Sequence, residues 1–147
     1  MRTFGQLLAS SRPVVALSSG STVHDAIATM VLNDISAVAV LHDDALVGIV
    51  TERDLVRKMF SSGRTPERLG EIMTSQLITV SPADSAEACM ALMIENHIRH
   101  LPVLERGRMV AMLSMRDLVR HILAEKEFVI AQMTDYISGT PSAPRIQ

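Results

Sequence analysis

The sequence predicts a mixed α/β (α+β) fold made of two pseudo-symmetric repeats, each a strand, a helix, two strands and a second helix. The first observation is internal repetition. Shifted by 63 positions, residues 17–58 align with residues 80–121 without a gap, and about a dozen pairs are identical. The second is a helical apolar pattern, and the third a pair of short apolar runs, each present in both copies. At 147 residues the chain can bury one core or two small ones that share an interface.

Each copy opens with an extended run, at 13–17 and at 77–80, and an amphipathic helix follows. Thr22 with Asp25, and Asp84 with Glu87, are typical of helix starts because a capping side chain is followed three residues later by an acid. Apolar residues then recur at i, i+3, i+4, i+7 and i+8, the spacing of one helix face. They are Val23, Ala26, Ile27, Met30 and Val31 in the first copy, and Ala86, Cys89, Met90, Met93 and Ile94 in the second.

Two short apolar runs joined by a polar turn follow each helix and predict a β-hairpin. They span 38–41 and 46–50 in the first copy, and 101–104 and 109–113 in the second. A second helix then begins at Thr51 or Ser114. Because a sheet of three short strands buries little by itself, we expect the two sheets to pack face to face.

The predicted division places the first repeat, with an N-terminal helix that includes Leu8, at 1–63. The second repeat occupies 64–138 and a flexible tail 139–147, with a turn-rich join at 61–66. The last helix continues beyond the repeat with an apolar side. That side either folds back on its own repeats or closes a homodimer, and the pattern alone leaves both open. Its members are Ile122, Val129, Ile130, Met133 and Ile137, and the N-terminal helix also includes Phe4 and Leu7.

Composition narrows the function class. The net charge of −2 and the lack of a basic run argue against nucleic acid as a partner. No stretch is apolar for long enough to span a membrane, and the first residues do not resemble a secretory signal, so we expect a cytoplasmic protein. Cys89 lies in a helical apolar pattern and is interpreted as core. His97 and His100 lack companions for a metal site, so no metal is expected.

The chemistry is expected where each hairpin runs into its second helix, at 47–54 and 110–117. Each copy places an apolar strand, a hydroxyl residue, two variable residues and an Asp there. One interpretation is a helix cap, in which the hydroxyl and the acid satisfy backbone amides. The other is a nucleotide site, because a helix N-terminus favours phosphate and a carboxylate accepts hydrogen bonds from a ribose diol.

This motif, repeated after a hairpin, is similar to the nucleotide-binding signature of CBS (cystathionine-β-synthase-type) domains. The stretches 71–74, 78–82 and 98–103 also resemble that family, and the likeness covers about residues 7 to 125. The resemblance implies two repeats paired in one module with two clefts. Each cleft would take an adenosine compound such as AMP, ADP, ATP, S-adenosylmethionine or NAD, with AMP expected first. The protein would be a regulatory module without catalysis or a catalytic cofactor. It would form a homodimer and signal to a separate protein partner.

The resemblance also assigns roles to residues. It implies that Asp54 and Asp117 hold the ribose hydroxyls, and that Thr51 and Ser114 contact phosphate or ribose. The second copy adds Arg99 and His100, and is expected to bind the more anionic ligand, although a solvated charge cluster explains these two residues as well. The other positions implied as ligand contacts are Ile49, Arg53, Ile78, Pro102, Met112 and Arg116. The competing hypothesis is a ligand-free dimeric adaptor that works through its helices.

Overall fold

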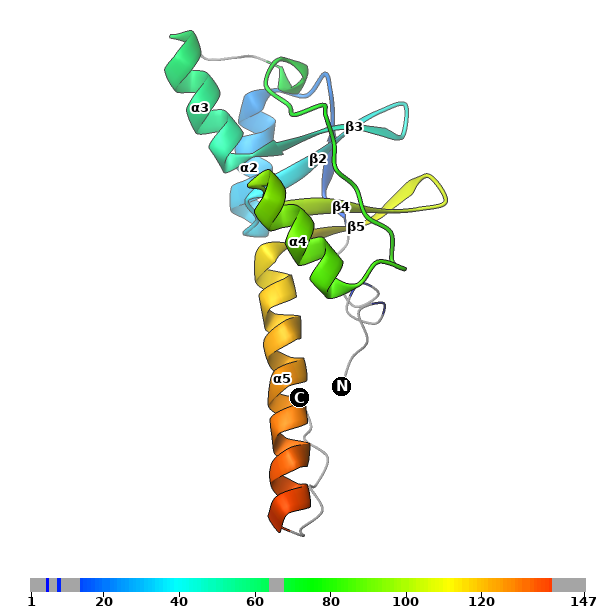
Figure 1. The fold of residues 1–147 in the computed structure, drawn as a ribbon. Helices are drawn as coiled ribbons and strands as arrows, with labels where there is room; N and C mark the ends of the chain where they lie inside the picture. Colours follow the sequence, from blue (N-terminus) through cyan, green and yellow to red (C-terminus); the bar gives the residue numbers. More distant parts are fainter. Residues whose placement is uncertain (1–4, 6–7, 9–13, 64–67, 139–147) are drawn as a thin grey trace.

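The computed structural model describes residues 5, 8, 14–63 and 68–138, and both repeats are present (Figure 1). A three-stranded sheet has the order β1-β2-β3, and a two-stranded sheet pairs β4 with β5. Strands β3 and β5 contact each other and so bring the two sheets together. The elements are β1 (Ala16–Ser18), α2 (Val23–Asn33), β2 (Ala37–His42), β3 (Ala45–Thr51), α3 (Glu52–Ser62), the 3-10 helix η1 (Leu69–Glu71), α4 (Ala86–Asn96), β4 (His100–Glu105), β5 (Arg108–Ser114) and α5 (Met115–Ser138).

The strand registers confirm the repeat of 63 residues. Leu17 lies opposite Val40 in a parallel pair, and Val80 forms the matching parallel bridge with Val103. Both hairpins contain a register shift at the same place, after Val40 and after Val103. The predicted strand at 77–80 is reduced to that bridge within the described residues. The order strand, helix, strand, strand, helix is therefore confirmed in the first repeat and nearly so in the second.

The two hairpin turns use the same backbone conformation with different residues. In the first turn, Asp43 and Asp44 have positive φ angles of 48° and 65°. In the second turn, Arg106 and Gly107 have φ angles of 53° and 76°. Two consecutive residues with positive φ are typical of the tight turn whose twist matches that of the two strands. Because glycine adopts this conformation without a steric penalty, the second turn is the less strained of the two.

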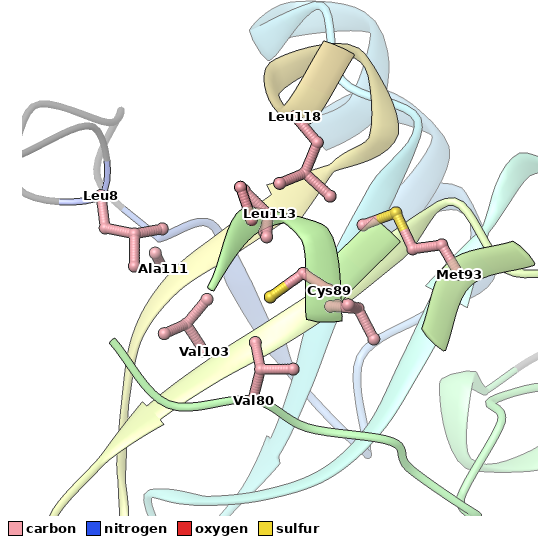
Figure 2. Packing of buried hydrophobic residues seen from close by; sticks show 10 residues of the cluster. Leu8, Val80, Cys89, Met93, Val103, Ala111, Leu113 and Leu118 are labelled. Atoms are coloured by element: carbon pink, nitrogen blue, oxygen red, sulfur yellow. The ribbon is translucent and has the colours of Figure 1, made fainter. Parts of the chain in front are cut away.

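Each repeat has its own apolar core, but the segments that precede the repeats exchange places. Leu8 packs in the core of the second repeat, beside Ala111 (Figure 2). Leu69 and Ile72 are buried in the core of the first repeat. The amide of Leu69 donates to the carbonyl of Ser21, and this hydrogen bond holds the segment against the first repeat. The two repeats are thus linked by their leading segments, while the predicted limits 1–63 and 64–138 stay a prediction.

In both α2 and α4, the face that is buried in the core is narrower than the predicted apolar face. In α2, Val23, Ala26 and Met30 are buried in the core, whereas Ile27 and Val31 are exposed. In α4 the pattern repeats, because Ala86, Cys89 and Met93 are buried and Ile94 is exposed. The core position of Cys89 is confirmed, and burial raises the pKa of its thiol.

One predicted helix start is wrong. Ser85, and not Asp84, caps α4, because its side chain accepts a hydrogen bond of 3.1 Å from the amide of Ala88. Asp84 accepts instead from the amide of Ser81, at 2.7 Å, in the preceding turn. The start of α2 is confirmed, since Thr22 and Asp25 form a reciprocal capping box. Of the predicted N-terminal helix, only Gly5 and Leu8 are described, and both are helical. Phe4 and Leu7 lie outside the described residues.

Helix α5 is the longest element, with 24 residues, and its second half projects away from the two sheets (Figure 1). Its first turns are anchored by Leu118, which is fully buried, and by Ile122 at the edge of the core. Farther along, Ile130, Met133 and Ile137 are exposed. The helix therefore does not fold back to bury this side against the described residues of its own repeats.

Candidate functional site

The first motif lies where β3 ends and α3 begins. The amide of Thr51 donates to Oδ2 of Asp54 at 2.9 Å, and the amide of Asp54 donates to Oγ1 of Thr51 at 3.2 Å. Each side chain therefore satisfies a backbone donor at the start of α3, which is the capping box. Asp54 is half-buried, so its carboxylate is reachable from outside.

The second motif has the same arrangement at the start of α5. The amide of Ser114 donates to Oδ2 of Asp117 at 3.1 Å, and the amide of Asp117 donates to Oγ of Ser114 at 3.2 Å. The Ser114 hydroxyl also donates to Oδ2 of Asp117, at 2.7 Å. The two contacts that involve the carboxylate both use Oδ2, so they leave Oδ1 of the half-buried Asp117 to face another partner. The helix-cap interpretation of the motif is confirmed in both copies.

A cap by itself does not distinguish a ligand site from an ordinary helix start. Thr22 and Asp25 form the same reciprocal box at α2, with distances of 3.1 Å and 3.0 Å. These hydrogen bonds lower the pKa of the Asp25 carboxyl. The surroundings of the caps at α3 and α5 must therefore carry any argument for binding.

The first turns of α3 and α5 have most of their amides occupied. In α3 the amide of Glu52 donates to the carbonyl of Ser36 at 3.0 Å, and Asp54 donates to Thr51. In α5 the amide of Met115 donates in the same way to the carbonyl of Arg99, at 2.8 Å. The amides of Arg53 and Arg116 take no part in these contacts. An anion at either helix start would thus meet one backbone donor and an exposed guanidinium.

A segment that follows the first repeat closes one side of the first motif. Thr74 and Ile49 exchange two backbone hydrogen bonds, of 2.9 Å and 3.1 Å, so this segment extends the sheet beyond β3. The hydroxyl of Thr74 then points to Oδ1 of Asp54 at 3.5 Å. Next to it, the side chain of Met73 lies over Gly48, where an added Cβ would come within 2.9 Å of three Met73 atoms.

The second motif is joined to the first repeat through His100. Oγ of Ser36 and Nε2 of His100 share a hydrogen bond of 3.1 Å across 64 positions of sequence. Burial lowers the pKa of His100, as does the Arg99 guanidinium, while Asp117 and Glu52 act in the opposite direction. Both helix starts therefore contribute an acidic side chain to the surroundings of one half-buried imidazole.

The remaining predicted contacts differ in accessibility. Pro102 is fully buried in β4, and Ile49 is 8 % exposed in β3. Met112 and Ile78 are half-buried, the latter against the second core. None of the four has a contact that tests a ligand role, so each stays a prediction. The three arginines implied by the resemblance, Arg53, Arg99 and Arg116, are exposed.

Three residues at this location were not predicted as contacts. Ser36 reaches His100, Glu52 contributes to its electrostatic surroundings, and Thr74 reaches Asp54. The repeat offered a signal for Ser36, since it aligns with Arg99. For Thr74 the signal was its place in the stretch 71–74 that resembles the family, but its contact with Asp54 depends on pairing between distant segments.

Two findings bear on other classes of protein. Within the described part of the chain, no helix has both the length and the apolar character that crossing a membrane requires. Over the same residues, no group of three or more His, Cys, Asp or Glu side chains is placed to bind a metal ion.

Comparison with known proteins agrees with this geometry. The family model described as "CBS domain" matches twice, at residues 5–61 and 69–124. CBS domain-containing protein CBSX3, mitochondrial, of Arabidopsis thaliana is 36 % identical over 129 residues, which cover 83 % of this chain and 63 % of the relative. The match therefore spans less than two thirds of that relative's own length.

Solved structures show the same fold. A protein with CBS domains from Burkholderia ambifaria MC40-6 has a TM-score of 0.78 and 38 % identity, with 84 % of this chain and 95 % of that one covered. The structure of CBSX2 in complex with AMP has a TM-score of 0.73 at 22 % identity, and covers 84 % of this chain and 98 % of the other. With two matches that together take in most of its residues, the chain belongs to the CBS domain family and contains two CBS domains in tandem.

Proposed function

We propose that this protein is a regulatory module that binds an adenosine nucleotide at the starts of α3 and α5 and passes the signal to a separate partner. The observation that carries the proposal is the pair of half-buried aspartates, Asp54 and Asp117, each placed at a helix start with an exposed arginine beside it. A helix start and a guanidinium attract phosphate, and a carboxylate oxygen accepts from ribose hydroxyls. A nucleotide presents both groups.

The ligand proposed first is AMP, within a class that also includes ADP, ATP, NAD and S-adenosylmethionine. CBSX2 is a family member of the same fold whose structure contains AMP, which supports an adenosine compound as the class. At 22 % identity that likeness concerns the fold, so AMP itself is an inference from the site.

The site at α5 is proposed to take the more anionic end of the ligand. It has two basic side chains, Arg99 and His100, where the first repeat has Ser36 and Ala37. A phosphate near His100 would favour its protonated form and so oppose the effect of burial on its pKa. Nucleotide binding at this site should therefore be coupled to proton uptake.

A ligand-free adaptor remains the second candidate, and a specific observation favours it. Both aspartates already use Oδ2 to cap their helices, as Asp25 does at α2. If capping were their whole purpose, the repeats would serve as a scaffold for protein contacts. The two candidates differ in whether any nucleotide stabilises the protein.

Regulation in trans, self-association and a cytoplasmic location complete the proposal. The provisional assignment of the Burkholderia protein to signal transduction supports a regulatory role. The apolar side chains exposed along α5, among them Ile130 and Met133, support a homodimer, because exposed apolar surface of this kind is typical of interfaces. The balanced composition and single cysteine suit the reducing cytoplasm.

The test is a titration of nucleotide against thermal unfolding and calorimetry. Asp117→Asn is the chosen change, because the amide oxygen still accepts from the Ser114 amide while the charge and one acceptor are lost. A ligand at about 100 times its Kd stabilises the native state by about 2.7 kcal/mol. We expect AMP to stabilise the wild type and Asp117→Asn to lose most of that shift.

Asp25→Asn is the matched control, since it changes the same kind of cap at a helix outside the proposed site. It should change basal stability slightly and leave the response to AMP intact. Two outcomes would make the adaptor, and not the sensor, the function. In the first, none of the five compounds stabilises the wild type. In the second, Asp117→Asn and the double variant Asp54→Asn/Asp117→Asn both respond like the wild type.

A further inference from the structure

Helix α5 carries an exposed apolar stripe with a regular spacing along most of its length. Val119, Leu123, Ile130, Met133 and Ile137 lie 4, 7, 3 and 4 residues apart. With Lys126 filling the open position, the spacing alternates between four and three over the whole run. This is the seven-residue repeat with which one helix packs against another. Their exposed fractions rise from 42 % at Val119 to 84 % at Ile137.

The stripe requires a covering partner for a physical reason. Residues 125–138 extend beyond the part of the chain matched by the family, and they lie away from both cores (Figure 1). An isolated helix of this length is marginal in water, because most helix stability in proteins comes from packing of the apolar face. A heptad spacing selects another helix as that partner, rather than a flat surface.

We propose that the covering partner is α5 of a second copy of this chain, packed antiparallel along the stripe. This inference gives the proposed homodimer a specific interface and rests on that homodimer. Centred on residue 128, the pairing brings Val119 of one copy to the level of Ile137 of the other, and Leu123 to the level of Met133.

The charges along α5 favour the antiparallel direction. Its first half contains Arg116, Arg120 and Lys126 against Asp117 and Glu125, whereas the charged residues of its second half are Glu127 and Asp135. Antiparallel packing places the more positive half of one helix along the negative half of the other, and opposes the two helix dipoles. Parallel packing would instead stack Lys126 on the same residue of its partner, inside the apolar seam.

The available area is sufficient for a stable pair. Burying an exposed aliphatic side chain removes roughly 60–120 Å² of apolar surface, which follows from the usual 1.5–3 kcal/mol at about 25 cal/mol per Å². Val129 and Tyr136 flank the stripe and are also exposed. The seven side chains, weighted by exposure, offer roughly 300–500 Å² per copy, and with their polar neighbours the pair reaches the ~1,000 Å² of a specific interface.

The surface near the sheets leaves room for the second helix. Leu118 and Ile122 face the core of the second repeat, whereas Val119 and Leu123 on the stripe are 42 % and 54 % exposed. A partner helix can therefore follow the stripe as far as the first turns of α5. The two pairs of repeats would then lie at opposite ends of the joined helices.

Site-directed disulfide cross-linking of the full chain tests the proposal. Cys89 is first replaced by Ala, the residue that the first repeat has at the aligned position, Ala26. Val119→Cys/Ile137→Cys should then form a disulfide-linked dimer in most of the protein, while either single cysteine should not. Within the double-cysteine chain, Ile130→Asp should abolish the cross-link, and Gln132→Asp, on the opposite side of α5, should leave it unchanged.

Sedimentation of the same proteins separates the possible failures. A dimer that forms no link between residues 119 and 137 overturns the α5 interface while the proposed homodimer stands. A link by Ile137→Cys alone shows parallel packing and also overturns the proposal. A chain that sediments as a monomer at high concentration overturns both the interface and the homodimer, and points to a different protein as the partner of α5.

Discussion

A methyl group added at Gly48 tests how the segment after the first repeat is held against β3. In Gly48→Ala the new Cβ would lie 2.5 Å from Sδ, 2.8 Å from Cγ and 2.9 Å from Cβ of Met73. Cβ is close to the backbone and cannot move away as the end of a flexible side chain can. Overpacking of this kind costs about 1–3 kcal/mol.

The sign of the effect should depend on Met73. Glycine in a strand is less stable than alanine by roughly 0.5–1 kcal/mol when nothing opposes the extra methyl group. In a Met73→Gly background, which also removes the Cβ of residue 73, Gly48→Ala should therefore stabilise the protein by about that amount. In the wild-type background it should destabilise it by about 1–3 kcal/mol.

Urea unfolding of the four proteins of this double-mutant cycle measures the coupling, provided that the m-value stays constant. The second repeat supplies a control, because Ala111 occupies the aligned position and Leu8 packs beside it (Figure 2). Ala111→Gly should destabilise the protein by about 1–2 kcal/mol through loss of a buried methyl group and added chain freedom. Equal effects of Gly48→Ala with and without Met73 would refute the packing argument.

Three further predictions concern pH, capping and the exchanged segments. Burial lowers the pKa of His100 below 6.5, so on acidification the unfolded chain binds this proton before the folded chain does. The free energy of unfolding should therefore be full above about pH 6.5 and fall as the pH drops below it. In urea titrations from about pH 7.5 to 5, His100→Gln should reduce this loss. Ser85→Ala should cost about 1 kcal/mol of unfolding free energy by removing the α4 cap, whereas an unchanged urea midpoint would contradict that assignment. Leu69→Ala should cost about 2–5 kcal/mol, as for any fully buried leucine, while the matched change of exposed Leu32 should cost far less.

The sequence predicted the elements well where the signals are local. Hairpins at 38–50 and 101–113, the helix starts at Thr51 and Ser114, and the repeat of 63 residues all appear in the structure. Turn residues, alternating apolar runs and caps act over a few residues, so their pattern survives without knowledge of the fold. The cap of α4 was misassigned because Asp84 and Ser85 are both good capping residues, and only the backbone path separates them.

The candidate site was predictable in part for the same reason. The motif itself indicated that Thr51 would meet Asp54 and that Ser114 would meet Asp117, and both pairs are in contact. The hydrogen bond between Ser36 and His100 could not be read from the sequence, because it joins residues that come together only when β2 and β4 are placed. The same holds for Thr74 beside Asp54.

The chain alone determined a duplicated unit, its order of strands and helices, and a hydroxyl and an acid at each second helix start. These follow from spacing and from the chemistry of neighbouring residues. The tertiary structure decided which core receives each leading segment, with Leu8 in one and Leu69 in the other, and which apolar side chains stay exposed along α5. An apolar stripe specifies that a face will be covered, but the covering surface is selected by shape and volume across distant segments, and local sequence does not contain that information.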